Sequence, residues 1–175
     1  ASHGILPSAG HTDATGAELN RAVDAGCRLV THLYSCCSTV TRDHGFRRLG
    51  VIEQTFLCDD VYAEIIADGC HLPPDLIRLI LKVMGKSRVA LVTDALSLAG
   101  TDAKSGRMMA TDYIIEDGVC KLTDRSAFAG SIATTDRLVR VMRDEVGVPL
   151  RDAVAMAADV PAQIMGLRKG RLAAG

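Results

Sequence analysis

The chain contains 175 residues, which is enough for one domain with a substantial core. Its 20 basic and 21 acidic side chains give a formal net charge of −1, which argues against a protein that binds a nucleic-acid backbone. No apolar stretch approaches the roughly 20 residues that cross a bilayer, and the first residues lack a signal-peptide pattern, so we expect no membrane partner.

The six cysteines form no recognisable disulfide framework or zinc ribbon. Cys36 and Cys37 are adjacent, and no Cys-x-x-Cys pair occurs in the sequence. The others lie in or beside apolar runs, where a free cysteine behaves as a small hydrophobic residue: Cys27, Cys58, Cys70 and Cys120. Unpaired cysteines at this density are typical of the reducing cytosol, so we expect a cytoplasmic protein.

The first half of the chain alternates apolar runs with helical patterns, which predicts βα units, a parallel sheet and an α/β fold. We expect a helix over residues 13–25, capped by Thr12 or Asp13, and then a strand over residues 27–34. Residues 35–48 are polar and predict a long loop, which in a compact domain is usually functional. A short helix over residues 49–57 is expected next.

The second half begins with predicted strands at residues 62–67 and 89–93. Between them, a helix is expected from Pro73-Pro74 to Met84, because proline suits the first helical turn. The pattern then changes, and residues 113–122 predict a β-hairpin with Asp-Gly near its turn. Helical patterns follow from Ser131 to Val146 and over residues 150–158 and 161–165. No linker divides the chain, so we expect one domain.

Polar residues follow the ends of several predicted strands. His32, His71 and Asp94 each come shortly after an apolar run, and in a parallel barrel such positions face the active site. His11 is separated from His32 by one predicted helix, so both imidazoles are expected to reach one metal ion. Taken singly, each histidine also suits a hydrogen-bonded structural position, and Asp94 suits a helix cap. As a group, they predict a metal or acid–base site.

Five motifs occur in one order along nearly the whole chain: Gly10-His11-Thr12-Asp13-Ala14-Thr15, Thr31-His32-Leu33-Tyr34, Ile66-Ala67-Asp68-Gly69-Cys70-His71, Val92-Thr93-Asp94-Ala95 and Ala129-Gly130-Ser131. Together they resemble the N-acetylglucosamine-6-phosphate deacetylases, a family of the amidohydrolase superfamily. The resemblance implies a metal-dependent (β/α)8 TIM-like barrel. Residues 1–175 would be its C-terminal portion, containing the later βα units and the inserted β-hairpin, with no second complete domain.

The resemblance also implies roles for the polar residues at the strand ends. His11 and His32 would be ligands of a divalent metal, commonly Zn²⁺. His71 would hydrogen-bond the substrate and help to polarise its acetamide carbonyl. Asp94 would take a proton from the attacking water and later give it to the departing amine.

The resemblance also implies substrate contacts, and at one of these positions this sequence differs from the family. Ser35 and Cys36 stand where the family has an Asn-Ala pair that touches the sugar phosphate, and a hydroxyl offers fewer hydrogen-bonding groups than an amide. Arg42 resembles the family's phosphate-binding arginine, although Arg47 and Arg48 compete for that role. The segment that would line the sugar site is Phe128, Ala129 and Gly130.

The implied activity is hydrolysis of N-acetylglucosamine 6-phosphate to glucosamine 6-phosphate and acetate, in amino-sugar catabolism. The substrate partner would be an amino-sugar phosphate, and the full-length enzyme would be a homodimer. Two alternatives stay open: another amidohydrolase acting on a different amide or cyclic amide, which Ser35-Cys36 favours, and an inactive fragment or interaction module. Because the family's glutamate ligand lies outside these residues, we expect the isolated chain to bind metal weakly and not to turn over substrate.

Overall fold

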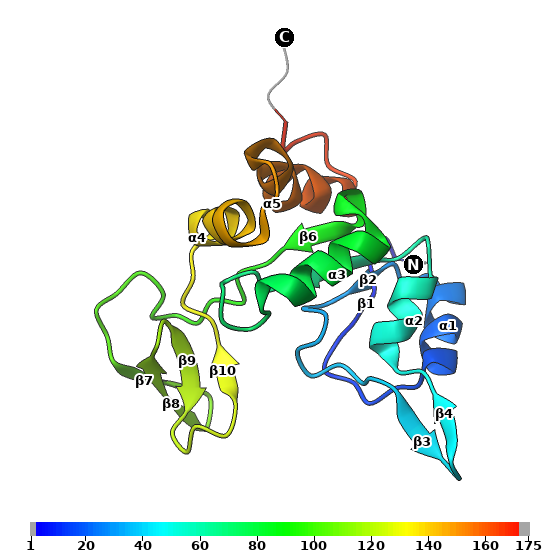
Figure 1. Ribbon diagram of the computed structural model, residues 1–175, viewed down its shortest axis with the longest axis horizontal. Helices are drawn as coiled ribbons and strands as arrows, with labels where there is room; N and C mark the ends of the chain where they lie inside the picture. Colours follow the sequence, from blue (N-terminus) through cyan, green and yellow to red (C-terminus); the bar gives the residue numbers. More distant parts are fainter. Residues whose placement is uncertain (1–2, 172–175) are drawn as a thin grey trace.

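A parallel four-stranded sheet forms the centre of the computed structural model, which describes residues 3–171 (Figure 1). Its strands are β1 (Ser8–Ala9), β2 (Leu29–Val30), β5 (Tyr62–Ile65) and β6 (Val89–Leu91), in the order β1-β2-β5-β6. Every neighbouring pair is parallel. The predicted α/β class and parallel sheet are therefore confirmed, although each strand is shorter than its apolar run.

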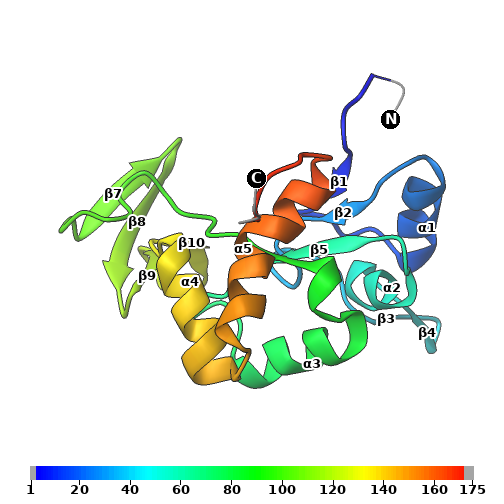
Figure 2. The ribbon, with the colours of Figure 1, turned by 90° about the horizontal axis from the view of Figure 1, so that it is seen from above.

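Helices cover one face of this sheet (Figure 2). They are α1 (Gly16–Asp24), α2 (Val51–Leu57), α3 (Pro74–Met84), a 3₁₀ turn (Lys86–Arg88), α4 (Thr135–Val141), a π-helical turn (Met142–Val146) and α5 (Leu150–Ile164). On β5, Ala63 and Ile65 are fully buried in the core, whereas the alternating residues Tyr62 and Glu64 are only half-buried. On β5, this period of two shows that one face packs against the helices and the other is more open, whereas all residues of β2 and β6 are buried.

Helix α1 begins three residues later than the sequence pattern suggests. Thr15 is the N-cap, and Glu18 completes a capping box, because the Glu18 side chain accepts a 2.8 Å hydrogen bond from the Thr15 backbone. Thr12 cannot act as the cap, since its backbone pairs with Cys37 in a parallel bridge. The predicted cap at Thr12 or Asp13 is therefore wrong.

Part of the predicted loop over residues 35–48 is a β-hairpin. Strands β3 (Thr41–Asp43) and β4 (Phe46–Arg48) pair antiparallel around His44 and Gly45. Both turn residues have positive φ, 47° and 88°, as a tight hairpin turn requires. The loop prediction failed because the hairpin is almost entirely exposed and has no apolar face to reveal a period of two.

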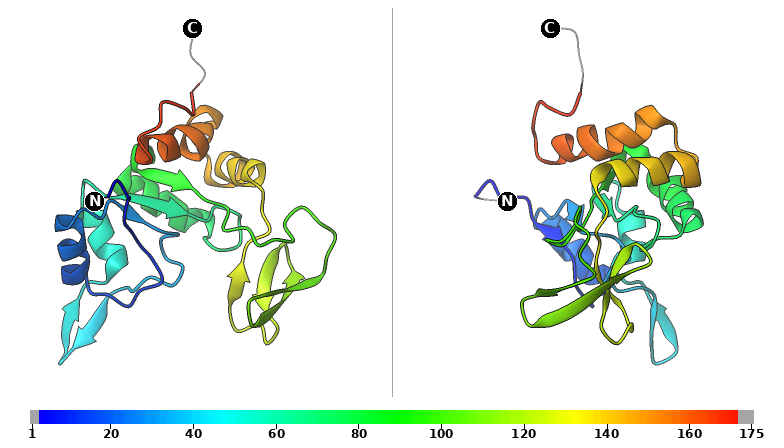
Figure 3. Two further views of the ribbon diagram at one scale, coloured as in Figure 1. Left: turned by 180° about the vertical axis from the view of Figure 1, so that it is seen from behind. Right: turned by 90° about the vertical axis from the view of Figure 1, so that its left-hand side faces the viewer.

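The inserted β-structure is larger than one hairpin. The predicted hairpin is confirmed as β8 (Thr111–Glu116) and β9 (Val119–Leu122), but β7 (Ser105–Met108) and β10 (Phe128–Gly130) extend it to the order β10-β9-β8-β7. Gly106 permits this packing, because a Cβ there would lie 2.5 Å from the buried Tyr113 hydroxyl. This sheet and the β3–β4 hairpin lie at opposite ends of the molecule (Figures 1 and 3).

The helices near the end of the chain also differ from expectation. Helix α5 is continuous through Pro161, so the prediction of separate helices at 150–158 and 161–165 is wrong. Proline removes one donor near the end of the helix, but the Pro161 carbonyl still accepts a hydrogen bond from the Met165 N–H. No helix in residues 3–171 combines the length and apolar character needed to cross a membrane.

Candidate active site

The polar residues predicted from the strand ends lie at one edge of the parallel sheet. His11 follows β1, His32 follows β2, His71 lies in the loop after β5 and Asp94 follows β6. Because all four strands are parallel and adjacent, their carboxyl ends meet at the same edge, with neighbouring strands about 4.8 Å apart. The side chains of this edge therefore come from every strand of the described sheet.

The imidazoles of His11 and His32 are in direct contact. Their Nε2 atoms lie 2.9 Å apart, and their ring centroids are 4.7 Å apart with the rings at 67°. Both backbones are left-handed, with φ of 46° and 30°, which is strained for residues other than glycine. Gly10 permits the close approach of the two strand ends, because a Cβ there would lie 2.8 Å from the Thr31 Cβ.

This pair fits part of a metal centre. Their Nε2 atoms face each other at 2.9 Å, a hydrogen-bond distance when one ring carries the proton, and neutral imidazole nitrogens are donors that zinc binds. The Nδ1 atom of His32 is buried and has no hydrogen-bond partner in the described residues. Residues 3–171 contain no group of three or more metal-ligating side chains. They therefore offer two converging nitrogens, one ligand short of a usual protein site.

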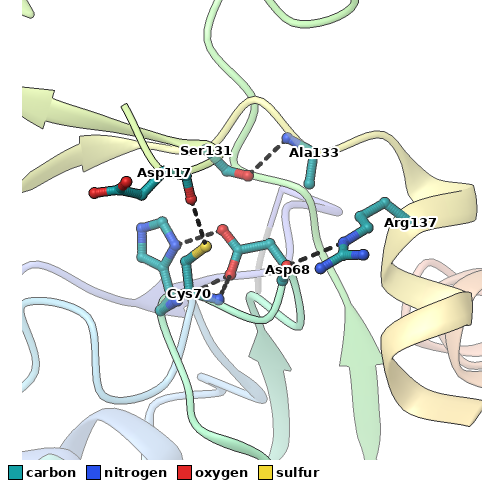
Figure 4. A network of polar contacts seen from close by, with 7 residues as sticks. Asp68, Cys70, Asp117, Ser131, Ala133 and Arg137 are labelled. Atoms are coloured by element: carbon teal, nitrogen blue, oxygen red, sulfur yellow. Dashed lines mark hydrogen bonds and ion pairs between the residues drawn. The ribbon is translucent and has the colours of Figure 1, made fainter. Parts of the chain in front are cut away.

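His71 is held by a buried carboxylate that the sequence analysis did not assign to the site. Asp68 lies just beyond β5, and its side chain is 1 % exposed. One carboxylate oxygen accepts hydrogen bonds from the backbone N–H groups of Cys70 and His71, at 2.8 and 2.9 Å. The other lies 2.8 Å from His71 Nδ1. Figure 4 shows this carboxylate among the surrounding polar groups.

The environment of Asp68 favours its charged form. Burial alone would raise the pKa of Asp68, but hydrogen bonds from the His71 imidazole and from two backbone N–H groups outweigh burial and hold the pKa below its ordinary value. The ring of Phe128 packs edge-on against His71, with centroids 5.0 Å apart. His71 is thus fixed on one side by an ionised carboxylate and on another by an aromatic ring.

Asp94 lies on a strained turn that the inserted sheet holds in place. Its φ is 49°, its side chain is exposed, and its carbonyl accepts a 3.0 Å hydrogen bond from the Ser131 N–H. The Ser131 carbonyl in turn accepts a 2.9 Å hydrogen bond from the Leu96 N–H. Gly130, with φ of 140°, permits this contact, because a Cβ there would lie 3.0 Å from the Leu96 side chain.

A cavity opens beside His11. It is lined by His11, Thr12, Asp13, Cys36 and Cys37. The Cys36 thiol is exposed and follows a left-handed backbone with φ of 51°, and Ser35 donates its N–H to the His32 carbonyl at 2.9 Å. The structure therefore brings Ser35 and Cys36 next to the histidine pair.

Comparison with known protein families gives a match, in which the Amidohydrolase family profile covers residues 4–175. This chain belongs to the amidohydrolase family. Members of this family are typically metal-dependent.

Three amidohydrolases illustrate the similarity. N-acetylglucosamine-6-phosphate deacetylase of Lysinibacillus sphaericus is 31% identical over 98% of this chain and 43% of its own length. N-acetylgalactosamine-6-phosphate deacetylase of Shewanella sp. (strain ANA-3) is 30% identical over 93% of this chain and 40% of its own length. The crystal structure of N-acetylglucosamine-6-phosphate deacetylase from Pasteurella multocida superposes with a TM-score of 0.91 at 30% identity.

The share of each protein that these matches cover shows which part of the fold the chain represents. The chain is covered almost completely, at 99% in the P. multocida structure, but it spans only 45% of that protein. The four parallel strands and their helices are thus part of the amidohydrolase TIM-like barrel, which confirms the predicted partial barrel. The chain spans less than half the length of the relatives that it matches.

Among the predicted substrate-contacting residues of this amidohydrolase, Arg42 lies on the exposed β3–β4 hairpin and not at the strand edge. It lies exposed on β3 and pairs in register with Arg47 on β4, so both guanidinium groups extend from one face of the hairpin. Arg48 instead forms an ion pair with Asp43. In the described residues, the Arg42 side chain makes no ion pair or hydrogen bond. By contrast, Phe128 contacts His71, and Gly130 lies against the Asp94 turn.

Two carboxylates near the site escaped the sequence analysis. Asp68 ends a buried strand as Asp94 does, so the same signal could have found it. Glu64 lies inside β5, on the face opposite the helical core. Burial raises the pKa of Glu64, the neighbouring His32 opposes this shift, and the charge of Asp94 adds to it. In the sequence, the charged Glu64 within the apolar run of residues 62–67 was the sign that one face of this strand does not pack in the hydrophobic core.

Proposed function

We propose that residues 1–175 form the C-terminal portion of one catalytic barrel domain in a metal-dependent deacetylase. The reaction is hydrolysis of N-acetylglucosamine 6-phosphate to glucosamine 6-phosphate and acetate. The observation that carries this proposal is the 2.9 Å convergence of the His11 and His32 Nε2 atoms at the strand edge that also carries His71 and Asp94. The names of the relatives support the choice of substrate.

His11 and His32 would hold a divalent metal, for which Zn²⁺ is the best match to two imidazole nitrogens. Such an ion, when bound, polarises a carbonyl oxygen and lowers the pKa of water. A further protein ligand comes from the part of the enzyme that this chain does not span. The chain's own contribution to the metal centre would therefore be two converging imidazole nitrogens.

Asp94 serves as general base and then as general acid. Its carboxylate takes a proton from the water that attacks the acetamide carbon, and a carbon–oxygen bond forms. The same group returns the proton to the nitrogen as the carbon–nitrogen bond breaks, so that the amine leaves neutral. The exposed side chain on a rigid turn suits this role, because the carboxylate can reach substrate while its backbone stays fixed.

The substrate is held by groups around this edge. His71 hydrogen-bonds the substrate and helps to polarise the acetamide carbonyl, and Arg42 binds the 6-phosphate, with Arg47 beside it on the hairpin. Sugar contacts come from Ser35, Cys36, Phe128, Ala129 and Gly130. The full-length enzyme is a homodimer and acts in the cytoplasm on small amino-sugar phosphates.

A second substrate is N-acetylgalactosamine 6-phosphate, which differs in the configuration of one hydroxyl group. Two relatives, from Shewanella sp. (strain ANA-3) and Escherichia coli O157:H7, are named deacetylases of this sugar, and each is 30% identical to this chain. Cys36 lines the cavity beside His11, and the Ser35 N–H bonds the His32 carbonyl, so a change in sugar preference would be expressed at these two positions.

A fusion enzyme tests the proposal. Residues 1–175 are joined to the part of the P. multocida deacetylase that this chain does not span, and acetate release is measured with Zn²⁺. We expect turnover of N-acetylglucosamine 6-phosphate, weaker turnover of the unphosphorylated sugar, and a loss of about 10²-fold or more in kcat for Asp94→Asn. The galactosamine isomer is assayed in parallel. A folded, metal-loaded fusion that deacetylates neither phosphorylated sugar would contradict the proposal.

A further inference from the structure

Asp68 and His71 form a buried carboxylate–imidazole pair within the candidate site. The carboxylate of Asp68 is 1 % exposed and the His71 side chain 8 %, so water is largely excluded from their 2.8 Å contact. Within residues 3–171, the three hydrogen bonds to this carboxylate come from its own loop: the N–H of Cys70, the N–H of His71 and the His71 ring. The loop therefore closes around the carboxylate and fixes the ring orientation.

The chemistry of this contact dictates which ring nitrogen carries a proton. An ionised carboxylate only accepts hydrogen bonds, so the imidazole nitrogen facing it must be a donor. Nδ1 faces Asp68, and within the described residues Nε2 makes no hydrogen bond. The proton of a neutral ring therefore lies on Nδ1, and Nε2 is left for an external group.

Other contacts hold the Asp68 loop from both sides. The Asp68 carbonyl accepts a hydrogen bond from Arg137 Nε of helix α4 at 3.4 Å, and Cys70 Sγ donates to the Asp117 carbonyl of the inserted sheet at 3.7 Å (Figure 4). Gly69, with φ of 86°, lies under the Arg137 guanidinium, where a Cβ would approach within 3.2 Å. The loop is thus tied to α4 and to the inserted sheet.

We propose that Asp68 is a positioning residue: it fixes the imidazole of His71 with a proton on Nδ1, so that Nε2 is the ring atom presented to the substrate. This inference rests on the proposed function for its catalytic meaning, but the protonation of the ring can be tested without turnover. Asp68 itself stays ionised and touches no substrate. Its effect on the reaction passes through the orientation and tautomer of His71.

The chain contains a matched pair for comparison. Asp43 and His44 also place a carboxylate oxygen 2.8 Å from a histidine Nδ1, but the His44 side chain is 93% exposed. The two pairs thus share the contact distance and differ in burial. Solvent competes freely at His44, so the proton on its neutral ring should be distributed between both nitrogens, whereas His71 should show one tautomer.

Nitrogen NMR of the chain labelled with ¹⁵N-histidine measures this directly at about pH 8, above the usual histidine pKa. His71 and His44 signals are assigned from His71→Gln and His44→Gln. We expect His71 Nδ1 to be protonated and Nε2 unprotonated, while His44 shows averaged signals. A proton on His71 Nε2, or an averaged His71 ring, would overturn the proposal. The tautomer is read from the wild-type spectrum, and the two variants serve only to assign its signals.

Asp68→Asn tests the role of Asp68 by reversing which ring nitrogen of His71 is expected to carry the proton. An asparagine oxygen can still accept from the backbone N–H groups, but its NH₂ group would face Nδ1 and require an unprotonated nitrogen there. We expect the neutral His71 tautomer to switch to Nε2–H and kcat of the fusion enzyme to fall about 10²-fold or more. Asp43→Asn should change neither. An unchanged His71 tautomer in a folded Asp68→Asn variant would contradict the proposal, whatever the fusion's activity.

Discussion

The contact between His11 and His32 brings together two imidazole nitrogens of the type that bind a divalent cation. The two Nε2 atoms are 2.9 Å apart, a hydrogen-bond distance when one ring carries the proton, and both residues have positive φ, which is strained for residues other than glycine. A metal ion would draw both nitrogens to a common centre. The strain at these two residues is thus consistent with a preformed half of a metal centre.

Zinc binding to the chain alone tests this explanation. Isothermal titration should detect weak binding of Zn²⁺, because only two protein ligands are present in the described residues. His11→Gln should lower the affinity at least about tenfold, since one of two ligands is lost. His44→Gln is the matched control, because His44 is exposed on the hairpin. Equal affinities in all three proteins would exclude the histidine pair as the binding site.

Asp68 should also make stability depend on pH. Its folded-state pKa lies below the ordinary value of about 3.9, so its stabilising effect is fully present above that pH and is lost as pH falls through the folded-state pKa. At pH 7, Asp68→Asn should lower the free energy of unfolding by about 1–3 kcal/mol. Urea unfolding should show this difference shrinking as the pH falls below about 4. A difference that grows on acidification would contradict this assignment.

At the level of single residues, polar positions just after predicted strands pointed to His32, His71 and Asp94, and the one-helix spacing from His32 added His11. The structure brings all four to one edge of the parallel sheet. The sequence reasoning missed the use of Asp68, since a carboxylate three residues before a histidine gives no sign of facing its ring. Side-chain direction depends on the loop's tertiary contacts, which one sequence does not reveal.

Among the helices, α1 offers a clear test of where a helix begins. Thr15 and Glu18 form its capping box, whereas Asp13 is exposed and makes no hydrogen bond in the described residues. Thr15→Ala should lower the free energy of unfolding by about 1 kcal/mol, and Asp13→Ala should stay within about 0.5 kcal/mol of wild type. Chemical denaturation of both variants measures the difference. The reverse ranking would restore the cap predicted from the sequence.

The junction between β10 and the Asp94 turn should be sensitive to one methyl group. Gly130→Ala places a Cβ against Leu96 at a φ of 140°, whereas Gly118→Ala changes a positive-φ glycine in the same sheet with open space around it. Gly130→Ala should destabilise the chain by at least about 1 kcal/mol more than Gly118→Ala. In the fusion enzyme, it should also lower kcat through displacement of Asp94. Equal effects of the two variants would separate Asp94 from the inserted sheet.

The elements themselves could be predicted to different degrees. Strands with buried faces and helices with apolar stripes were recognised, because burial imposes a period on the sequence. The β3–β4 hairpin and strands β7 and β10 were not, since they are short and largely exposed. Pro161 misled the prediction of α5, because a proline near the end of a helix removes a donor without ending the helix.

In the molecule as a whole, the parallel sheet is an open arc. Within the described residues, β1 and β6 are the outer strands, each hydrogen-bonded on one side only. Strand edges of this kind invite pairing with further strands. The relatives are more than twice as long as the chain, which agrees with the proposal that the remaining strands complete the barrel. An interaction module without activity would need neither the strained histidines nor the Asp94 turn.

The most direct measurement is acetate release from N-acetylglucosamine 6-phosphate by two Zn²⁺-loaded proteins: the 175-residue chain alone, and the fusion with the remaining part of the P. multocida deacetylase. The proposed half-site predicts no turnover by the chain and clear turnover by the fusion, abolished by a chelator and restored by Zn²⁺. Deacetylation by the isolated chain at a rate near that of the fusion would contradict it, because His11, His32, His71 and Asp94 would then suffice without the rest of the barrel.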